Sequence, residues 1–450
     1  MTDARRGEPT PPIDIAGGGA AARTRWAGAV AVPDRAVEQL TAACARVSTD
    51  LDETAEAGRD WWPIGLRWAV AGEVPARPAV VVQPASTDEV AAVVRIAGEH
   101  RIPVTAMAGR SGVCGASIPA FGGIALDLTA LRGIVDVDRE SLLVDVRPGT
   151  FGDVFEDELR DNHDVTLGHW PQSMALSTVG GWLACRSAGQ YSTRYGKIED
   201  MVVGLEVVLA DGTVVRTGGA APRAAVGPDL TQLFVGSEGT LGIITEARLR
   251  VHPRPAAERR AAFGFDSFAA GLDACRRILQ RGATPAVLRL YDARESRRNF
   301  STDRGVHALI VLDEGDPRLV DAVLGVVTEE CAGATPLDEA LVEQWLGHRN
   351  DVSGLQKAVH AGLVVDTTEV AARWSVLADL YTDAVAALEA MGGTLAATSH
   401  QSHAYTDGAC LYFTYAGQPP DGDADGWYRR AWDTVTEVTA HHGGAISHHH

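Results

Sequence analysis

Three glycine-rich segments carry residue types suited to binding a ligand through backbone atoms. The first occupies residues 106–112 and follows an apolar stretch typical of a β-strand. Glycine lets successive backbone N–H groups turn toward one anion, such as a pyrophosphate. The segment lacks the Gly-x-Gly-x-x-Gly spacing of a Rossmann dinucleotide site. Taken alone, it is equally typical of a plain tight turn.

Residues 168–189 and 236–245 form two further segments in which small and hydroxyl-bearing side chains are dense. Such density lets a backbone approach a bulky planar cofactor closely. Each segment by itself could be a glycine-rich connection between strands. The occurrence of all three in this order favours a cofactor site.

The second half of the chain holds side chains suited to acid–base chemistry. His448–His450 end the chain, with His400 and His403 upstream, and histidine titrates nearest neutral pH. Tyr412 lies in an apolar stretch, as a core tyrosine also would, and Arg289 alternates with leucines, as a solvent-facing arginine would. The terminal histidines could equally be a tag remnant. The five histidines together could bind a metal, but their spacing supports this weakly, and we predict no metal site.

Strands and helices must position these groups. Residues 78–106 read as strand, helix, strand, with Ser86-x-x-Glu89 as a capping box. From there to about residue 255 short strands dominate, and Asp211-Gly212 predicts a hairpin. Beyond it we expect helices and strands in an α+β arrangement. The helices are expected at 269–280, 368–391 and 427–442, and the strands at 306–312 and 409–415.

The parts of the chain follow from these patterns. We expect a disordered start (1–22), a helical segment (23–76), a cofactor-binding domain (77–255) and a substrate or cap domain (256–450). A chain of 450 residues with 46% hydrophobic and 22% charged residues has an ordinary globular composition.

Composition also excludes several function classes. The net charge of −19 makes nucleic acid an unfavourable partner. The six cysteines are scattered, which argues against zinc and disulfide frameworks and favours a cytoplasmic location. No apolar run approaches the roughly 20 residues of a membrane span. A homodimer is one assembly that the sequence leaves open.

The order and spacing of the glycine-rich segments resemble the FAD-binding domain of the vanillyl-alcohol-oxidase (PCMH-type) superfamily. The resemblance implies an α+β fold in which a two-subdomain PCMH-type FAD-binding domain precedes an α+β substrate or cap domain. Because no histidine stands at the tethering positions, it implies non-covalent FAD. Arg110 departs from the family, which usually has glycine there, and could clash with the pyrophosphate or pair with it. By position, the implied FAD contacts are Ala106, Met107, Ala108, Gly109, Arg110, Ser111, Gly112, Pro171, Gln172, Ser173, Ser177, Thr178, Gly180, Gly181, Cys185, Arg186, Ser187, Ala188, Glu238, Gly239, Thr240, Leu241, Gly242, Ile243 and Ile244.

Within that superfamily, residues 78–450 most resemble alkylglycerone-phosphate synthase. Residues 284–292 look like its P-A-x-x-R-L-x-D motif, 408–413 like G-A-C-x-Y-F and 443–450 like G-G-x-x-S-H-H-H. The resemblance implies that Arg289 is required for activity, that Tyr412 shuttles a proton, and that His448, His449 and His450 belong to the active site. In the family the chain continues beyond the histidine run, so we expect the natural chain to continue past His450.

A second departure concerns the substrate. The family's substrate-binding arginine precedes a tryptophan by about 19 residues; counting back from Trp374 gives Leu355, and the nearest arginine is Arg349. Three hypotheses therefore remain for a small-molecule substrate. One is synthase-like flavin chemistry on a small oxygenated substrate without net redox change. Another is a 2-hydroxy-acid or alcohol dehydrogenase or oxidase. The third is a flavin-fold protein without catalysis.

Overall fold

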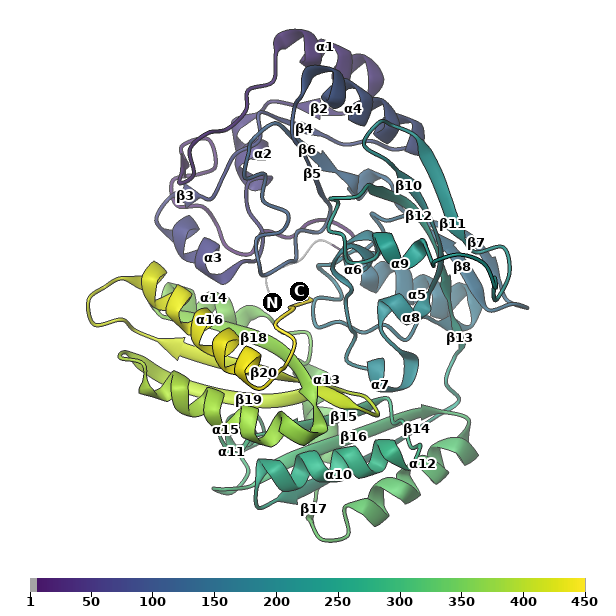
Figure 1. Cartoon of the computed structure of the whole chain (residues 1–450), viewed down its shortest axis with the longest axis vertical. Helices are drawn as coiled ribbons and strands as arrows, with labels where there is room; N and C mark the ends of the chain where they lie inside the picture. The colour runs from purple at the N-terminus through teal and green to yellow at the C-terminus, as the bar shows by residue number, and fades with distance from the viewer. Residues whose placement is uncertain (1–5, 450) are drawn as a thin grey trace.

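A small four-stranded sheet and two helices form the first layer of the chain, for which a computed structural model describes residues 6–449 (Figure 1). The sheet has the order β2-β4-β6-β5, and β4, β6 and β5 run parallel. α1 and α4 pack against each other and bury aliphatic side chains of the sheet. The bounds are α1 Asp34–Ala43, β2 Val47–Ser48, β4 Val80–Val82, α4 Thr87–His100, β5 Val104–Met107 and β6 Ile124–Asp127.

The capping box expected at the start of α4 forms in altered geometry. Ser86 Oγ accepts a hydrogen bond from the Glu89 backbone N–H at 3.2 Å, as predicted. The Glu89 carboxylate, however, accepts from the N–H of Ala85 at 2.9 Å and not from that of Ser86. The helix start was therefore readable from the sequence, although the reciprocal contact is displaced by one residue.

A second, antiparallel sheet of order β11-β10-β12-β8-β7 follows. The predicted hairpin joins β10 and β11. Short helices connect these strands and lie between this sheet and the rest of the molecule (Figure 1). The bounds are η1 Leu128–Ala130, β7 Ile134–Asp138, β8 Leu143–Val146, α5 Gly152–His163, β9 Val165–Thr166, α6 Val179–Cys185, α7 Ser192–Tyr195, α8 Ile198–Met201, β10 Val202–Val208, β11 Val214–Gly218, α9 Thr231–Phe234, β12 Ile243–Arg250 and β13 His252–Pro253.

The carboxy-terminal half is built on a seven-stranded antiparallel sheet of order β17-β14-β16-β15-β19-β20-β18. The long amphipathic helices α10, α12, α15 and α16 cover one face and bury the largest hydrophobic cluster (Figure 1). The other face turns toward the amino-terminal half. The bounds are β14 Ala257–Phe265, α10 Phe268–Gln280, β15 Val287–Tyr291, α11 Ala293–Phe300, β16 His307–Gly315, α12 Pro317–Glu330, β17 Thr335–Leu337, α13 Ala340–His348, α14 Ser353–His360, β18 Val364–Arg373, α15 Trp374–Ala390, β19 Thr394–Ala404, β20 Gly408–Gly417 and α16 Ala424–His441.

The helix predicted over residues 368–391 is wrong in its first six residues. Residues 368–373 belong to β18, and the helix α15 begins at Trp374. Every one of these residues pairs with β20 in antiparallel register. Pairing with a distant strand satisfies the backbone groups that a helix would have satisfied locally, so tertiary contacts override the local pattern.

The amino-terminal segment packs on the fold from residue 6 onward, and residues 1–5 of the segment expected to be disordered lie outside the described residues. Ile13 and Ile15 are buried against α3 (Pro63–Val70), and the Ala16 N–H donates to Ala69 O at 2.9 Å. The segment from 23 to 76 contains α1, α2 (Leu51–Glu56) and α3, together with two-residue strands β1 (Arg23–Thr24) and β3 (Glu73–Val74). Apolar residues within a Gly- and Pro-rich stretch thus suffice to anchor it.

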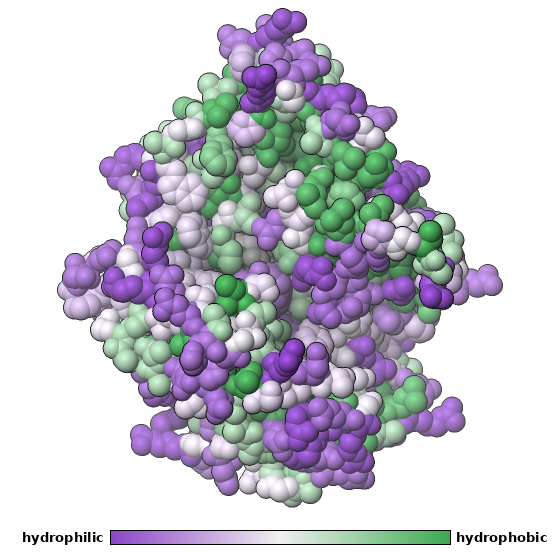
Figure 2. Space-filling model, in the orientation of Figure 1, coloured by the Kyte–Doolittle hydropathy of each residue, from purple (hydrophilic) through white to green (hydrophobic). Residues whose placement is uncertain are grey.

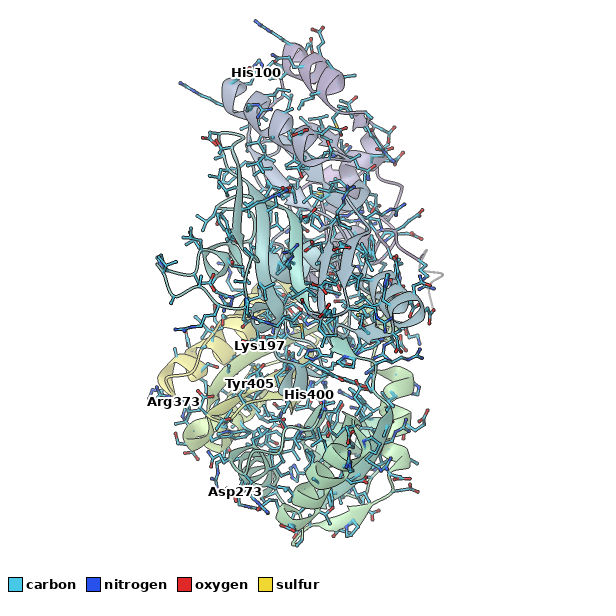
Figure 3. All side chains as sticks on the ribbon, turned by 90° about the vertical axis from the view of Figure 1, so that its right-hand side faces the viewer. His100, Lys197, Asp273, Arg373, His400 and Tyr405 are labelled. Carbon is cyan, nitrogen blue, oxygen red and sulfur yellow. The ribbon has the colours of Figure 1, made fainter. Side chains whose placement is uncertain are left out.

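The two halves meet through polar contacts as well as packing. Arg194 on α7 donates to the buried carboxylate of Asp313 on β16 at 2.9 Å. Lys197 lies 4.7 Å from the ring centre of Tyr405, and both lie close to the junction in Figure 3. Hydrophilic side chains cover much of the face shown in Figure 2. No helix within residues 6–449 is long and apolar enough to cross a membrane.

Candidate active site

A large cavity lies between the two halves and collects most of the residues singled out above. Its volume is about 900 Å³, near the upper end of the ~300–1,000 Å³ typical of ligand pockets. One wall comes from the glycine-rich segments and the other from β15, β19 and β20 of the large sheet. The cavity therefore joins a backbone-rich wall to one that bears acid–base side chains.

All three glycine-rich segments reach this cavity. The predicted FAD contacts that line it are Ala106, Met107, Ala108, Gly109, Arg110, Ser111, Gly112, Pro171, Gln172, Ser173, Ser177, Thr178, Gly180, Gly181, Cys185, Ser187, Ala188, Glu238, Gly239, Gly242, Ile243 and Ile244. Three predicted contacts do not line it: Arg186, Thr240 and Leu241. Arg186 turns toward Glu199 at 3.6 Å, and Leu241 is 45% exposed.

Gly109 shows why glycine is needed where the first two segments meet. A Cβ on Gly109 would lie 2.1 Å from the Leu176 carbonyl oxygen, so only glycine allows this backbone contact. Gly239 serves differently, since its φ is +79° and the nearest atom to a Cβ would be Ala106 Cβ at 3.7 Å. Glycines therefore both close the gap between segments and keep side chains out of the cavity.

Arg110 turns its guanidinium away from the segment it belongs to. Nη1 donates to the carbonyl oxygen of Glu56, at the end of α2. The side chain also borders a second cavity of about 290 Å³ that includes Glu56 and Asp127. Burial lowers the pKa of Arg110, and the nearby Asp127 and Glu56 oppose that shift. Its backbone has φ +55°, which costs a non-glycine residue about 1–2 kcal/mol.

This orientation predicts the effect of restoring glycine. Because the guanidinium is engaged with Glu56, Arg110→Gly should change the Kd for FAD by less than about threefold, since no charge-assisted bond to a pyrophosphate is lost. Titration of the FAD-free protein with FAD, followed by flavin fluorescence, measures this. A Kd raised tenfold or more would mean that Arg110 binds the pyrophosphate. The thermal unfolding temperature shows separately whether loss of the Arg110–Glu56 contact destabilises the protein.

The opposite wall brings together Arg289, His400 and Tyr412 from three neighbouring strands. In the sheet register His400 pairs with Tyr291 on one side and with Tyr412 on the other. The rings of His400 and Tyr412 are stacked with centroids 5.0 Å apart and an interplanar angle of 4°. Arg289, Tyr412, His400, Ser402 and His403 all line the cavity. Arg289 therefore does not face solvent, and Tyr412 is buried but borders the cavity.

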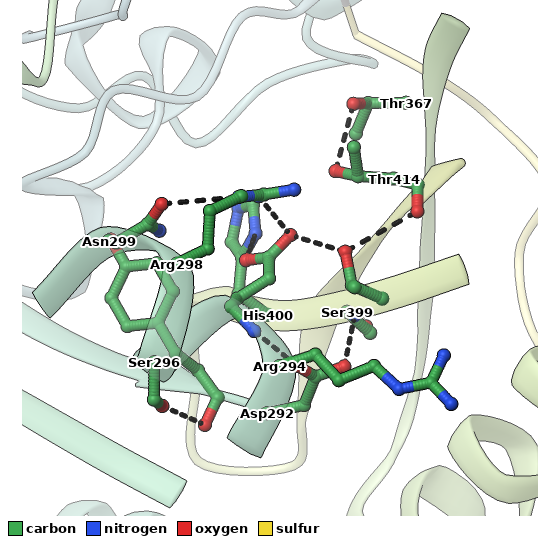
Figure 4. A network of polar contacts seen from close by, with 12 residues as sticks. Asp292, Arg294, Ser296, Arg298, Asn299, Thr367, Ser399, His400 and Thr414 are labelled. Carbon is green, nitrogen blue, oxygen red and sulfur yellow. Dashed lines mark hydrogen bonds and ion pairs between the residues drawn. The ribbon is translucent and has the colours of Figure 1, made fainter. Parts of the chain in front are cut away.

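His400 is held between the guanidinium of Arg289 and the carboxylate of Glu295. Figure 4 shows the polar network around His400, in which Arg298 also takes part. Arg289 Nη2 lies 2.7 Å from His400 Nε2, and Arg289 Nη1 donates to Ser402 Oγ at 2.6 Å. His400 Nδ1 lies 2.8 Å from Glu295 Oε2. A guanidinium can only donate, so Nε2 must accept and the ring proton must sit on Nδ1, facing Glu295. His400 is thereby fixed as one neutral tautomer.

The pKa shifts agree with that assignment. Burial and then the adjacent Arg289 lower the pKa of His400. Burial alone would raise the pKa of Glu295, but its contacts with His400 and Arg298 lower it to about 2. Arg298 lies 3.2 Å from the Glu295 carboxylate. At neutral pH the cluster therefore combines a neutral imidazole, an ionised carboxylate and guanidinium groups.

Tyr412 connects to a second histidine. His403 Nε2 lies 2.9 Å from Tyr412 Oη, and His403 Nδ1 lies 2.9 Å from Ser192 Oγ on α7. Burial lowers the pKa of His403 well below its usual value and raises that of Tyr412 well above its usual value. Both groups are neutral at neutral pH, and a neutral imidazole can accept a proton on one nitrogen while it donates from the other.

The last described residues also reach this wall. His448 and His449 line the cavity, whereas His450 lies outside the described residues. His449 Nδ1 pairs with the carboxylate of Glu369, and the Glu369 N–H donates to His448 Nδ1 at 3.0 Å. Burial lowers the pKa of His448 to about 4. Within residues 6–449, no group of three or more His, Cys, Asp or Glu side chains is arranged to hold a metal ion.

Sequence reasoning missed several partners in this site. Glu295, Ser402, Ser192 and Glu369 had not been singled out for chemistry, because each contacts its partner across at least 79 positions in the chain. Arg349, noted only as the nearest arginine, lines the cavity. The one local signal was that Glu295 follows the Arg289 motif closely.

The wall built by the glycine-rich segments fits FAD. It is mainly backbone and small side chains, and Gly239 leaves space that a side chain would fill. The cavity continues without a break from this wall to Arg289 and Tyr412. An elongated cofactor that binds through its pyrophosphate and exposes a ring at the other end matches that arrangement.

Two protein families match parts of this chain. Residues 78–218 match the family described as "FAD binding domain". Residues 254–450 match the family described as "FAD linked oxidases, C-terminal domain".

Full-length relatives and structures are similar across most of the chain. The uncharacterized FAD-linked oxidoreductase YgcU of Escherichia coli (strain K12) is 32% identical over 400 residues, covering 83% of this chain and 81% of that protein. Alkyldihydroxyacetonephosphate synthase of Dictyostelium discoideum is 30% identical, covering 84% of this chain and 67% of that protein. A solved alkyldihydroxyacetonephosphate synthase structure superposes with a TM-score of 0.83 at 27% identity, covering 98% of this chain and 85% of that one.

Proposed function

Because the chain belongs to the PCMH-type family of FAD-linked oxidoreductases, we propose that it activates a carbon atom bearing oxygen in a small hydroxy acid, alcohol or ester. The observation that carries this proposal is the convergence of Tyr412–His403 and Arg289–His400–Glu295 on the cavity whose other wall fits FAD. One acid–base pair and one group of three linked side chains beside the same cofactor wall suit the removal of a proton from a bound substrate.

The chain's own residues would divide the work. Bound FAD, held non-covalently by the glycine-rich wall, would supply the acceptor for electrons. Tyr412 Oη would exchange a proton with the substrate while His403 takes or returns one, since the high pKa of Tyr412 disfavours a free phenolate. His403 would pass that proton toward Ser192 at its other nitrogen.

Arg289 would hold the substrate's oxygen atom in place. Two of its nitrogens are occupied by Ser402 and His400, whereas its buried Nε has no hydrogen-bond partner among residues 6–449. A cation with a remaining donor stabilises negative charge that develops on a carbonyl or alkoxide oxygen. Glu295 and His400 would keep the guanidinium in position and balance its charge.

The second candidate is synthase-like chemistry without net oxidation. It is favoured by the similarity to the synthase structure over 98% of this chain and by the positions of Arg289 and Tyr412 in matching motifs. Oxidation of a hydroxy acid or alcohol and exchange on an ester both require the substrate carbon beside the flavin, so the same residues would serve either reaction.

Flavin content and anaerobic reduction test the proposal. The purified protein should absorb in the flavin bands and, because the FAD is non-covalent, release it on acid precipitation. Mixing anaerobically with 2-hydroxy acids and secondary alcohols should bleach the flavin if the enzyme oxidises its substrate. Product formation only from a long-chain alcohol plus an acyl ester, without lasting bleaching, would favour the synthase. A protein that cannot be reconstituted with FAD would refute both.

A further inference from the structure

We propose that Arg349, Gln190 and Trp170 form an oxyanion-binding subsite that takes a carboxylate or phosphate group of the substrate. Arg349 and Gln190 line the cavity, and Trp170 packs against Arg349. The inference rests on the proposed function, because it assigns a chemical class to the substrate of the same cavity. Three observations support it: the aromatic setting of Arg349, unsatisfied polar atoms, and local charge.

Arg349 follows α13 and is surrounded by aromatic rings. Its guanidinium carbon lies 4.9 Å from the ring centre of Trp170, 5.1 Å from that of Tyr191 and 5.5 Å from that of Trp345. Three such contacts fix the plane of the guanidinium and restrict its rotation. A planar donor group held in one orientation is suited to bidentate contact with a carboxylate or phosphate.

Unsatisfied polar atoms gather at this point. Arg349 Nη1, Trp170 Nε1 and Gln190 Oε1 are all buried and have no hydrogen-bond partner among residues 6–449. Gln190 touches Arg349 directly, since its Nε2 donates to the Arg349 carbonyl oxygen at 3.4 Å. Gln190 Oε1 can only accept a hydrogen bond, so it suits a hydroxyl beside the acid group, whereas the unsatisfied N–H groups of Arg349 and Trp170 are donors. Buried groups of this kind need partners, and an oxyanion would satisfy the donors together.

Local charge favours an anion although the whole chain is acidic. No salt bridge joins Arg349 to a carboxylate within the described chain, whereas Arg160 beside the same Trp170 is paired with Glu156 at 2.6 Å. Asp351 lines the cavity nearby, but its carboxylate accepts from the Ser353 N–H at 2.9 Å. Arg349 is thus a cation without a salt-bridge partner among the described residues, and its positive charge is available to an anion at this end of the cavity.

Anion titration of the FAD-loaded protein tests the subsite. The probes are inorganic phosphate and oxalate, added at constant ionic strength. The readouts are the flavin absorbance and the tryptophan fluorescence, to which Trp170 and Trp345 contribute among the ten tryptophans of the chain. The variants are Arg349→Met, which keeps an unbranched stem, and Arg349→Lys, which keeps the charge but not the planar fork. Arg297→Met is the matched control, because Arg297 is exposed on α11 and lies outside the cavity lining.

The wild-type protein should bind at least one probe, and the preferred probe distinguishes a phosphate ester from a carboxylate as the natural group. Arg349→Met should weaken that binding about tenfold or more, since a charge-assisted hydrogen bond is lost. The affinity of Arg349→Lys for the probe should lie between those of the wild type and Arg349→Met. The affinity of Arg297→Met should match that of the wild type. Failure of both probes to bind, or equal binding by Arg349→Met, would overturn the subsite.

These outcomes are separable from failure of the proposed function. Tryptophan fluorescence reports anion binding whether or not any substrate reduces the flavin. A protein that binds phosphate or oxalate through Arg349 but turns over no substrate would retain the subsite and lose the proposed reaction. A protein whose flavin is reduced by a substrate but which binds neither phosphate nor oxalate would retain the reaction and lose the subsite.

Discussion

Replacing Tyr412 by phenylalanine should leave FAD bound and lower turnover by about 10³-fold, because a positioned general acid or base contributes about 10²–10⁴-fold. The change removes only the hydroxyl that lies 2.9 Å from His403 Nε2, and the ring can keep its stacking on His400. Packing of the strand should therefore be preserved. Stopped-flow measurement of flavin reduction, or of ester exchange, gives the rate, and absorbance gives the flavin content.

Tyr415→Phe is the matched control for this change. Tyr415 lies on the same strand β20, but its hydroxyl is 3.0 Å from Thr368 Oγ1 in the core beneath α16 and does not line the cavity. Loss of this buried hydrogen bond should lower the free energy of unfolding by about 1 kcal/mol and leave turnover unchanged. If Tyr412→Phe reacts at the wild-type rate, Tyr412 has no part in proton transfer.

Arg289→Met should lower turnover by about 10²–10³-fold, the usual cost of removing one donor that stabilises a developing oxyanion. It also removes the two hydrogen bonds that hold Ser402 and His400. Arg294→Met is the control, because Arg294 lies on the adjacent α11 with a side chain that is 60% exposed. Steady-state kinetics should show the loss mainly in kcat, since FAD binds on the other wall.

The pH profile separates a chemical role of Arg289 from a structural one. In the wild type, burial and Arg289 lower the pKa of His400, so the ring stays neutral across the neutral range. Arg289→Met removes the repelling cation but leaves Glu295 at 2.8 Å, so the pKa of His400 should rise. Turnover of Arg289→Met should therefore fall as the pH drops from about 8 to about 5, where the histidine becomes charged.

Arg289→Lys gives the complementary measurement. Lysine keeps the positive charge, so the pKa of His400 should stay low, but one ammonium group cannot reproduce the contacts with both Ser402 and His400. Turnover of Arg289→Lys should therefore be reduced, but it should not show the additional fall at low pH that is expected for Arg289→Met. Parallel pH profiles for the methionine variant and the wild type would show that Arg289 does not control His400.

The sequence was informative about the cofactor wall because glycine-rich segments reflect local backbone demands. Gly109 is required by contact with Leu176, and most of the predicted FAD contacts line one cavity. The α+β fold and the PCMH-type family are confirmed. The roles of individual site residues stay predictions, which the variants above test.

Contacts between residues far apart in the chain decided other features of the structure, including the strand that replaces the first six residues of a predicted helix. The strand at 368–373 forms because β20 pairs with it. The segment at 6–22 packs on the fold through Ile13 and Ile15, which are buried against α3. Arg110 lines the cavity, but the contact of its guanidinium with the Glu56 carbonyl oxygen was not readable from the sequence. Neither a partner strand nor a partner carbonyl can be read from neighbouring residues.

The sequence by itself determined the three glycine-rich segments as candidates for cofactor binding. It also gave Arg289, Tyr412 and the terminal histidines as candidates for catalysis, because both sets depend on residue type and short spacing. Only the tertiary structure decided their chemistry. It placed Glu295 and Arg289 on opposite sides of His400 and so fixed the tautomer of that ring. It also left Arg349 among aromatic rings with an unsatisfied donor. Protonation and charge depend on neighbours in space, which come from strands and helices far apart in the chain.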